Sequence, residues 1–280
     1  MIRMDVESRP RPKLVGWGLL VWLVAVGCRA SESPPAEPQM LSVFAASSLT
    51  EAFAEVGRDF ETHHPRVKVR FHFAGSQVLR LQIEQGARAD AFASANPVHI
   101  EALRKSGAIA EAVKFAQNEL VVAVPRNGGT VERFEDLVDA SRIVVGTEGV
   151  PVGAYARQVL ERAKDRFGDR FVDRVWSRVV SRESNVRLVR AKVELGEADA
   201  AFVYRTDTLA SERLRVVPIP KEAAVRASYW IGVPAEAAHP KSAERFVRFV
   251  RSEAGAAILE RHGFGVPGSD GKAGRRPNDR

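Results

Sequence analysis

The chain has 280 residues, of which 45% are hydrophobic, 28% charged and 8% aromatic. This is an ordinary globular composition, and it excludes a disordered, collagen-like or polytopic membrane chain. The single cysteine excludes an intramolecular disulfide and a cysteine-rich zinc or iron–sulfur site. The length favours roughly two domains, since a domain takes about 150 residues.

The formal net charge is +7, and much of it lies at the two ends of the chain. Residues 1–27 and 268–280 each carry four basic and two acidic groups, which leaves a net charge of +3 for the residues between them. Arginines scattered singly over helices are typical of a solvated surface. The charge therefore makes no case for nucleic acid as a partner.

Residues 1–27 have the features of a signal peptide. Basic side chains come first, and the apolar run LVGWGLLVWLVAV then covers 13 residues, fewer than the about 20 that a transmembrane helix needs. Gly27 and Cys28 follow, and this junction resembles the bacterial lipoprotein signal, in which the cysteine is lipidated. Ala25 departs from that signal, which usually has leucine there. The alternative is an ordinary signal peptide in which the cysteine has no special role.

Two polar segments flank the expected folded part. Residues 28–40 contain the cysteine and a stretch rich in serine, proline and glutamate, which predicts a flexible tether. Residues 267–280 are polar and lack hydrophobic periodicity, which predicts a disordered tail.

Between these segments, short apolar runs alternate with helical patterns. Strands are predicted at residues 41–46, 67–74, 90–95, 119–125, 142–147, 199–204, 214–220 and 226–233. Helices are predicted from Ser48 onward, from Ser76 to Glu84, from Asn96-Pro97 to before Gly107, over 153–166, over 184–196, and as one or two helices over 241–261. Ser48 and Glu51 have the spacing of a capping box. The alternation predicts an α/β protein with mainly parallel sheets.

The folded part is long for a single sheet of such strands, so two lobes are expected. Ligands of open α/β sheets bind at the carboxyl ends of strands, where helices begin. Four such turns carry small or hydroxyl-bearing residues, namely AASS (45–48), AGS (74–76), TEGVPVGAY (147–155) and SNV (184–186). Free N–H groups and the positive end of the helix dipole make a helix start suited to an anion. Each turn taken alone is better explained as an ordinary helix start.

Five collinear segments resemble one family. They are LSVFAASSLTEAF, FAGSQVLRLQIEQGARADAFASAN, VVGTEGVPVGAYARQVL, ESNVRLVRAKVELGEADAAFVYRTD and HGFGV. Their order and spacing resemble the periplasmic molybdate-binding proteins of ABC importers, from about Leu41 to Val266. The resemblance implies a type II periplasmic-binding-protein fold, with lobe one at 41–120 plus 218–266, lobe two at 121–217, and an anion in the cleft between them.

The resemblance also implies a binding site. Ser48 and Ser76 would supply hydroxyl and N–H groups, Val152 and Val186 backbone N–H groups, and Tyr204 a phenolic O–H. Val152 departs from the smaller residue that is frequent in the family, although a backbone donor tolerates a change of side chain. The neighbouring residues Ser47 and Gln77 are further candidates for contacts.

An enzyme is the main alternative class. A serine hydrolase usually places its nucleophile in a G-x-S-x-G elbow, and neither AASSL nor AGSQV has that form. The six histidines lack helical metal spacing and a serine partner. The carboxylates of Asp90, Asp199 and Asp207 have no evident partner, and Asp207 is expected to cap or turn the chain after Tyr204.

Other ligands on the same fold form a second alternative: sulfate, another small anion, a metal cation or an organic acid. A ferric site would want two tyrosines with a carboxylate or histidine. An organic acid would call for an arginine, and Arg187 and Arg205 lie near motif positions. A purely structural lipoprotein is the third alternative.

The sequence therefore predicts a non-enzymatic receptor in the periplasm or cell envelope, anchored to the membrane through Cys28 if that residue is lipidated. The expected ligand is molybdate, with tungstate bound almost equally well, and the expected partner is an inner-membrane ABC permease. No organic cofactor and no metal other than that of the oxyanion is expected, and the protein is expected to be a monomer.

Overall fold

The computed structural model describes residues 37–267. The predicted signal peptide, Cys28, most of the tether and the tail after Pro267 lie outside the described residues. The first strand begins at Gln39 rather than Leu41. The end of the predicted tether, Gln39 and Met40, therefore belongs to the folded part.

Nine strands form one sheet within residues 37–267. Eight of them follow the order β2-β1-β3-β9-β4-β7-β5-β6, and β8 pairs with β4 off this path. The strands are β1 (Gln39–Ala46), β2 (Val67–Ala74), β3 (Ala91–Ser94), β4 (Ile109–Pro125), β5 (Ile143–Gly146), β6 (Val179–Glu183), β7 (Ala200–Tyr204), β8 (Leu214–Val217) and β9 (Arg226–Pro234).

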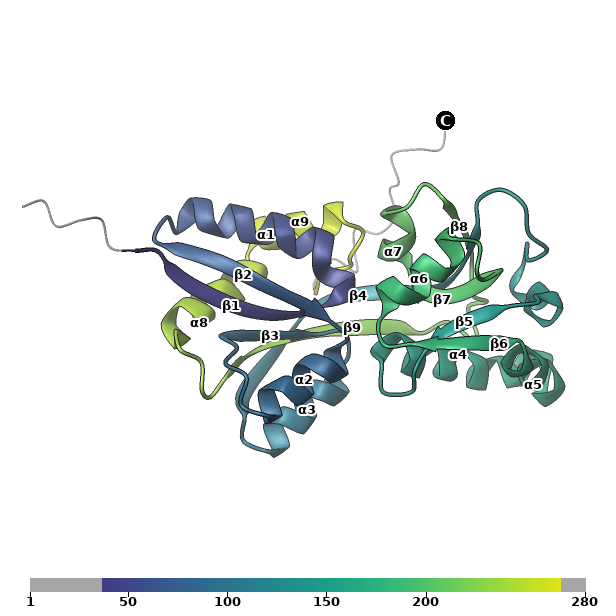
Figure 1. The fold of residues 1–280 in the computed structure, drawn as a ribbon, viewed down its shortest axis with the longest axis horizontal. Helices are drawn as coiled ribbons and strands as arrows, with labels where there is room; N and C mark the ends of the chain where they lie inside the picture. Colours follow the sequence, from purple (N-terminus) through teal and green to yellow (C-terminus); the bar gives the residue numbers. More distant parts are fainter. Residues whose placement is uncertain (1–36, 268–280) are drawn as a thin grey trace, which may run out of the picture. The chain divides into compact units, whose positions relative to one another are not determined.

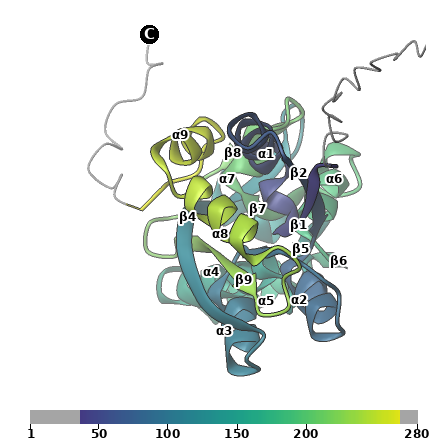
Figure 2. The ribbon, with the colours of Figure 1, turned by 90° about the vertical axis from the view of Figure 1, so that its left-hand side faces the viewer.

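Helices connect these strands and cover their faces. The α-helices are α1 (Thr50–His63), α2 (Ser76–Glu84), α3 (Pro97–Lys105), α4 (Pro151–Phe167), α5 (Asp169–Ser177), α6 (Val186–Glu194), α7 (Arg205–Leu209), α8 (Pro240–Val250) and α9 (Glu253–Arg261). Two 3-10 helices are η1 (Ser47–Leu49) and η2 (Phe134–Asp139). Figures 1 and 2 show α1 and α9 on one face of the β1–β3 strands and α2 and α3 on the other.

The strand β4 links two groups of strands. Its residues from Ile109 to Glu119 pair with β9, which continues to β3, β1 and β2. Its residues from Leu120 onward pair with β7 and β8 instead. Figure 1 shows β4 running between these two groups. The predicted lobe boundaries stay a prediction, because strand pairing does not say which residues move together.

The α/β class with flanking helices is confirmed, but the sheet is mixed. Parallel pairing joins β1 to β2 and β3, and β5 to β6 and β7. Every pairing of β4, and that of β9 with β3, is antiparallel. The parallel strands are those that feed directly into helices, so their carboxyl ends still lie beside helix starts.

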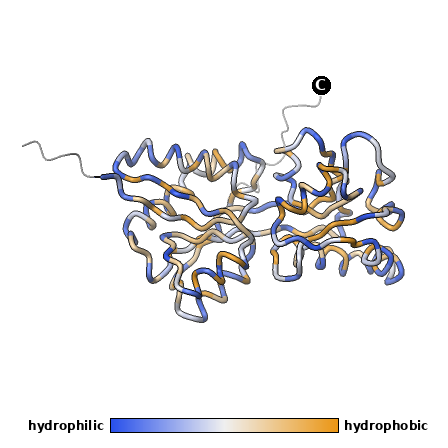
Figure 3. The backbone as a smooth tube through the Cα atoms, viewed as in Figure 1, coloured by the Kyte–Doolittle hydropathy of each residue, from blue (hydrophilic) through white to orange (hydrophobic). Residues whose placement is uncertain are grey.

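Local sequence explains most of these elements. In α1 the buried residues Phe53, Val56 and Phe60 repeat on one face, as their spacing predicts. The Asn96 side chain caps α3 by accepting from the His99 N–H, and Pro97 occupies the first helical position. Figure 3 shows apolar segments concentrated in the central strands, with hydrophilic stretches in the peripheral loops.

Several elements differ from the sequence prediction, among them the short helices η2 and α7, which the sequence did not predict. The strand β4 begins ten residues before the predicted start at residue 119, because the IAEAVKFAQN segment gains a long antiparallel partner in β9. The helix α5 was not predicted, although it buries Val172 and Val175 on one face. The short strand β6 was missed as well, since each alternate residue is exposed.

Candidate functional site

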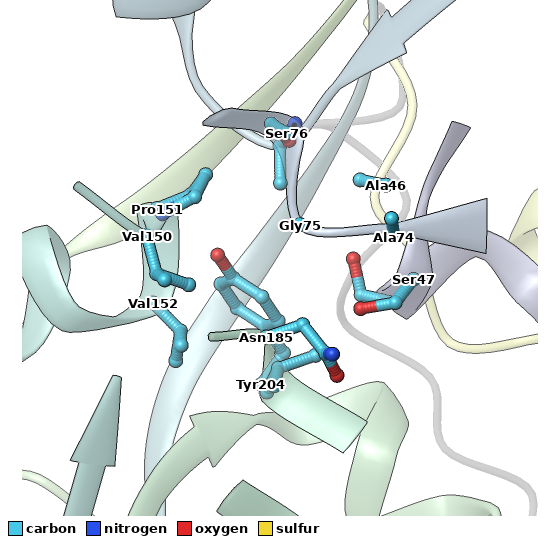
Figure 4. Close-up of a pocket in the computed structure, with 13 residues that line it drawn as sticks. Ala46, Ser47, Ala74, Gly75, Ser76, Val150, Pro151, Val152, Asn185 and Tyr204 are labelled. Atoms are coloured by element: carbon cyan, nitrogen blue, oxygen red, sulfur yellow. Dashed lines mark hydrogen bonds between the residues drawn. The ribbon is translucent and has the colours of Figure 1, made fainter. Parts of the chain in front are cut away.

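All five predicted ligand residues line one pocket, whose atom-free space, including the solvent at its opening, is about 200 Å³. Ser48 lies in the turn after β1 and Ser76 in the turn after β2. Val152 follows β5, Val186 follows β6, and Tyr204 ends β7. Figure 4 shows these turns arranged around the same space. The structure therefore brings the four helix-start turns and Tyr204 together, which their spacing in the sequence does not show.

Three helices direct their amino ends at this pocket. Ser76 is the first residue of α2, Val186 the first of α6, and Val152 the second of α4. The N–H groups of a first helical turn have no acceptor within their own helix. These amides, together with the positive ends of the helix dipoles, supply donors and partial positive charge for an anion.

Four buried hydroxyls complete the lining, those of Ser47, Ser48, Ser76 and Tyr204. The Ser48 Oγ lies 2.9 Å from the Tyr229 hydroxyl, and the Ser76 Oγ accepts from the Ala95 N–H at 3.1 Å. The Tyr204 hydroxyl has no hydrogen-bond partner within residues 37–267, and Figure 4 shows it directed into the space between Gly75 and Val150. Burial raises the pKa of Tyr204 well above its usual value, so this phenol stays protonated and remains a donor.

No lysine, arginine, aspartate or glutamate is among the described residues that line the pocket. The Asn185 side-chain oxygen caps α6 by accepting from the N–H groups of Arg187 and Leu188, at 3.0 and 3.2 Å. This carbonyl is therefore already occupied as an acceptor. The polar side chains of the lining consequently offer mainly donors.

The two arginines near the motifs are each paired with a carboxylate. The Arg187 guanidinium lies 2.5 Å from Glu51, and that of Arg205 lies 2.7 Å from Glu119. Neither arginine lines the pocket. This arrangement gives no support to a site in which an arginine binds an organic carboxylate.

The predicted capping box of Ser48 and Glu51 is wrong. Ser48 lies in η1 instead of capping α1, and no side chain caps either helix. Its hydroxyl is bonded to Tyr229, while the Glu51 carboxylate is bonded to Arg187. The predicted role of Asp207 is confirmed, because its carboxylate accepts from the Tyr204 N–H at 3.0 Å.

The glycines of the turns serve packing between chain segments. A Cβ on Gly75 would lie 2.4 Å from the carbonyl oxygen of Ser184, and one on Gly153 would lie 2.2 Å from that of Thr147. At Gly149 the nearest atom would be 3.9 Å away. At Gly75 and Gly153 the absence of a side chain therefore allows close contact with neighbouring backbone.

Contacts across the pocket were not predicted. The Gln77 Nε2 donates to the Ser184 carbonyl at 2.7 Å, and the His99 Nε2 lies 3.1 Å from the Gly149 carbonyl. Burial lowers the pKa of His99, which favours a neutral ring that donates through Nε2. Gln77 thus joins α2 to the turn before α6 and does not line the pocket. Ser47 does line the pocket.

Neither a metal site nor a membrane-spanning helix is found in the described part of the chain. No three histidine, cysteine, aspartate or glutamate side chains within residues 37–267 are grouped so that they could hold a metal ion. The carboxylates of Asp90 and Asp199 are used in structural contacts, with His239 and Arg142 respectively. No helix within the same residues has the length and apolar character to span a membrane.

Comparison with known proteins places the chain in a family. Residues 41–265 match the model of the bacterial extracellular solute-binding proteins. A Mycobacterium tuberculosis relative, molybdate-binding protein ModA, is 36% identical over 262 residues, which cover 91% of this chain and 97% of the relative.

Solved structures show the same fold. The periplasmic molybdate-binding protein of Azotobacter vinelandii matches with a TM-score of 0.71 and 19% identity, covering 81% of this chain and 99% of the other. The Mycobacterium tuberculosis sulfate-binding protein SubI matches with a TM-score of 0.72 and 16% identity, covering 82% and 88%. This is the type II periplasmic-binding-protein fold, and the family is one of binding proteins, not enzymes. The chain belongs to the family of bacterial extracellular solute-binding proteins.

Proposed function

We propose that the protein captures molybdate and delivers it to an ABC-type importer. The observation that carries this proposal is a small pocket whose polar groups are helix-start amides and buried hydroxyls, with no charged side chain on its described lining. The proposed ligand groups are Ser48, Ser76 and Tyr204 with the N–H groups of Val152 and Val186. The similarity to molybdate-binding proteins supports the same ligand.

The chemistry of the anion fits such a lining. Molybdate is a tetrahedral dianion that carries no proton at neutral pH, so all four of its oxygens accept hydrogen bonds. Hydrogen bonds to an ionised partner are worth about 1.5–3 kcal/mol each, so neutral donors suffice to hold it. Hydrogen phosphate brings a proton that requires an acceptor. Leaving that proton unpaired costs about 1–3 kcal/mol, which corresponds to roughly tenfold to hundredfold weaker binding.

Sulfate is the second candidate ligand, and the similarity to a sulfate-binding protein favours it. Sulfate also lacks a proton at neutral pH, so only its smaller size distinguishes it from molybdate. Tungstate has nearly the size of molybdate, and we propose that the site discriminates poorly between the two. Molybdenum is cargo in this account, and no organic cofactor is involved.

The proposed location is the periplasm or cell envelope. The signal-peptide features of residues 1–27 support export, and the junction at Cys28 supports a lipid anchor. A monomer would enclose the anion by closure of two lobes, at 41–120 plus 218–266 and at 121–217, and present the closed form to a permease. Closure requires that the anion bind the closed state more tightly than the open state.

A double variant tests the site directly. Ser48→Ala combined with Ser76→Ala removes two hydroxyl donors and leaves the helix-start amides in place. We expect molybdate binding to weaken at least about hundredfold, because two hydrogen bonds to an anion are lost. The measurement is calorimetric titration of the purified protein, with thermal unfolding as a check of folding. Unchanged affinity in the folded variant would refute this site.

A further inference from the structure

The hydroxyl of Ser76 has its direction fixed by a backbone N–H group. Its Oγ accepts the N–H of Ala95 at 3.1 Å, and both residues are buried. A backbone N–H can only donate, so the Ser76 oxygen uses a lone pair in this bond. The proton of Ser76 is therefore free to donate to a ligand.

The second serine has a different kind of partner. The Ser48 Oγ and the Tyr229 hydroxyl lie 2.9 Å apart, and either group is able to donate. Tyr229 is fully buried in β9, and Ser48 lines the pocket. The direction of this bond decides whether Ser48 offers a ligand a proton or a lone pair.

A neighbouring amide limits where the Tyr229 proton is able to point. The Asn118 Oδ1 accepts the N–H of Glu119 at 2.9 Å, and its Nδ2 donates to the Thr206 hydroxyl at 2.9 Å. In these two bonds the amide oxygen accepts and the amide nitrogen donates, which orients the Asn118 side chain beside Tyr229. Burial raises the pKa of Tyr229 well above its usual value, while Ser48 and Asn118 act in the opposite direction. The phenol stays protonated, and its other hydroxyl neighbour is Tyr204, which is itself a proposed donor to the anion.

The reverse direction, in which Ser48 donates to Tyr229, would weaken anion binding. If Ser48 donated to Tyr229, the buried phenolic proton would lose this acceptor, and Ser48 would turn a lone pair towards a bound anion. This arrangement replaces a donor to the anion by a lone pair and so loses a hydrogen bond worth about 1.5–3 kcal/mol. With Tyr229 as the donor, both hydroxyl protons are used, one on Ser48 and one on the anion.

We propose that Tyr229, with Asn118 behind it, is a positioning residue that fixes the Ser48 hydroxyl as a hydrogen-bond donor to the bound anion. Tyr229 does not touch the ligand and acts through Ser48. The inference rests on the proposed function in its choice of anion. It applies equally to any dianion without a proton, because it concerns only the direction of one hydrogen bond.

A double-mutant cycle on the full chain tests this inference. Tyr229→Phe keeps the ring and removes the hydroxyl, and we expect about tenfold weaker molybdate binding, the value of one hydrogen bond. In a Ser48→Ala background the same change should alter affinity by less than about twofold, because its target is already absent. Equal losses in the two backgrounds would indicate a purely structural role and overturn the proposal, as would an unchanged affinity of Tyr229→Phe.

Tyr155→Phe is the matched control. Tyr155 belongs to the same group of aromatic rings, but its hydroxyl accepts from the Ser228 N–H at 3.2 Å and has no bond to Ser48. We expect its molybdate affinity to stay within about twofold of the parent, and a loss as large as that of Tyr229→Phe would overturn the proposal. If the parent binds sulfate and not molybdate, the proposed cargo fails, and the same cycle run with sulfate still decides the role of Tyr229.

Discussion

The guanidinium of Arg187, in α6, lies 2.5 Å from the carboxylate of Glu51, in α1. Arg187 directly follows Val186, whose N–H is a proposed ligand group, and Glu51 is three residues after Ser48. The pair thus joins the two sides of the site while its positive charge is neutralised. The Arg187 side chain is 34% exposed and the Glu51 side chain 40%, so solvent screens the attraction between them.

Arg187→Met should therefore have little effect on anion binding. An exposed ion pair contributes about 0–1 kcal/mol, so we expect molybdate affinity to fall by no more than about fivefold. Arg205→Met is the matched control, since Arg205 is similarly exposed and paired with Glu119. Titration of both variants is the measurement. A loss of several hundredfold for Arg187→Met alone would mean that this arginine contacts the anion.

Gly75→Ala should weaken anion binding far more. Its added Cβ would meet the Ser184 carbonyl at 2.4 Å, so the turns before α2 and α6 would have to separate. Overpacking of this kind costs about 1–3 kcal/mol, which predicts roughly tenfold to hundredfold weaker molybdate binding. Gly149→Ala is the control, because its Cβ would meet nothing closer than 3.9 Å. Equal affinities of the two variants would contradict the account of the closed site.

Asp207 should make the stability of the protein depend on pH. Burial raises the pKa of its carboxyl from 3.8 to about 7, while the Tyr204 N–H and Arg190 act in the opposite direction. A carboxyl with a raised pKa binds more protons folded than unfolded. Its contribution to the free energy of unfolding therefore declines as pH rises from about 4 to about 7.

Asp207→Asn removes this titration and keeps an oxygen for the Tyr204 N–H. We expect the variant to unfold at a Tm higher than that of the parent at pH 8, by about 2 °C or more, and to gain less at pH 5. Thermal unfolding without ligand at both pH values is the measurement. An equal difference in Tm at the two values would show that the Asp207 carboxyl does not titrate as described.

The sequence was most informative where chain order and local pattern set the geometry. Ser48, Ser76, Val152 and Val186 follow strands directly, so the strand-to-helix pattern places each at a helix start. Tyr204 ends an apolar strand and is positioned by its own neighbour, Asp207. Their meeting in one pocket depends on tertiary packing, and the family resemblance, not periodicity, indicated it.

Contacts between distant parts of the chain left no local signal. Tyr229 is 181 residues from Ser48, and its position in an alternating strand predicts only burial. The same applies to Gln77 with Ser184 and to His99 with Gly149. The capping box predicted from the spacing of Ser48 and Glu51 is wrong because both side chains form hydrogen bonds with residues of other elements, Tyr229 and Arg187.

The most direct test of the central claim is calorimetric titration of the purified protein, shown to be folded and free of carried-over ligand, with molybdate, sulfate and phosphate at one ionic strength. The account predicts tight one-to-one binding of molybdate, weaker binding of sulfate, and binding of hydrogen phosphate at least about tenfold weaker than that of molybdate. No binding of molybdate, or preference for sulfate or phosphate over it, would contradict the proposed function.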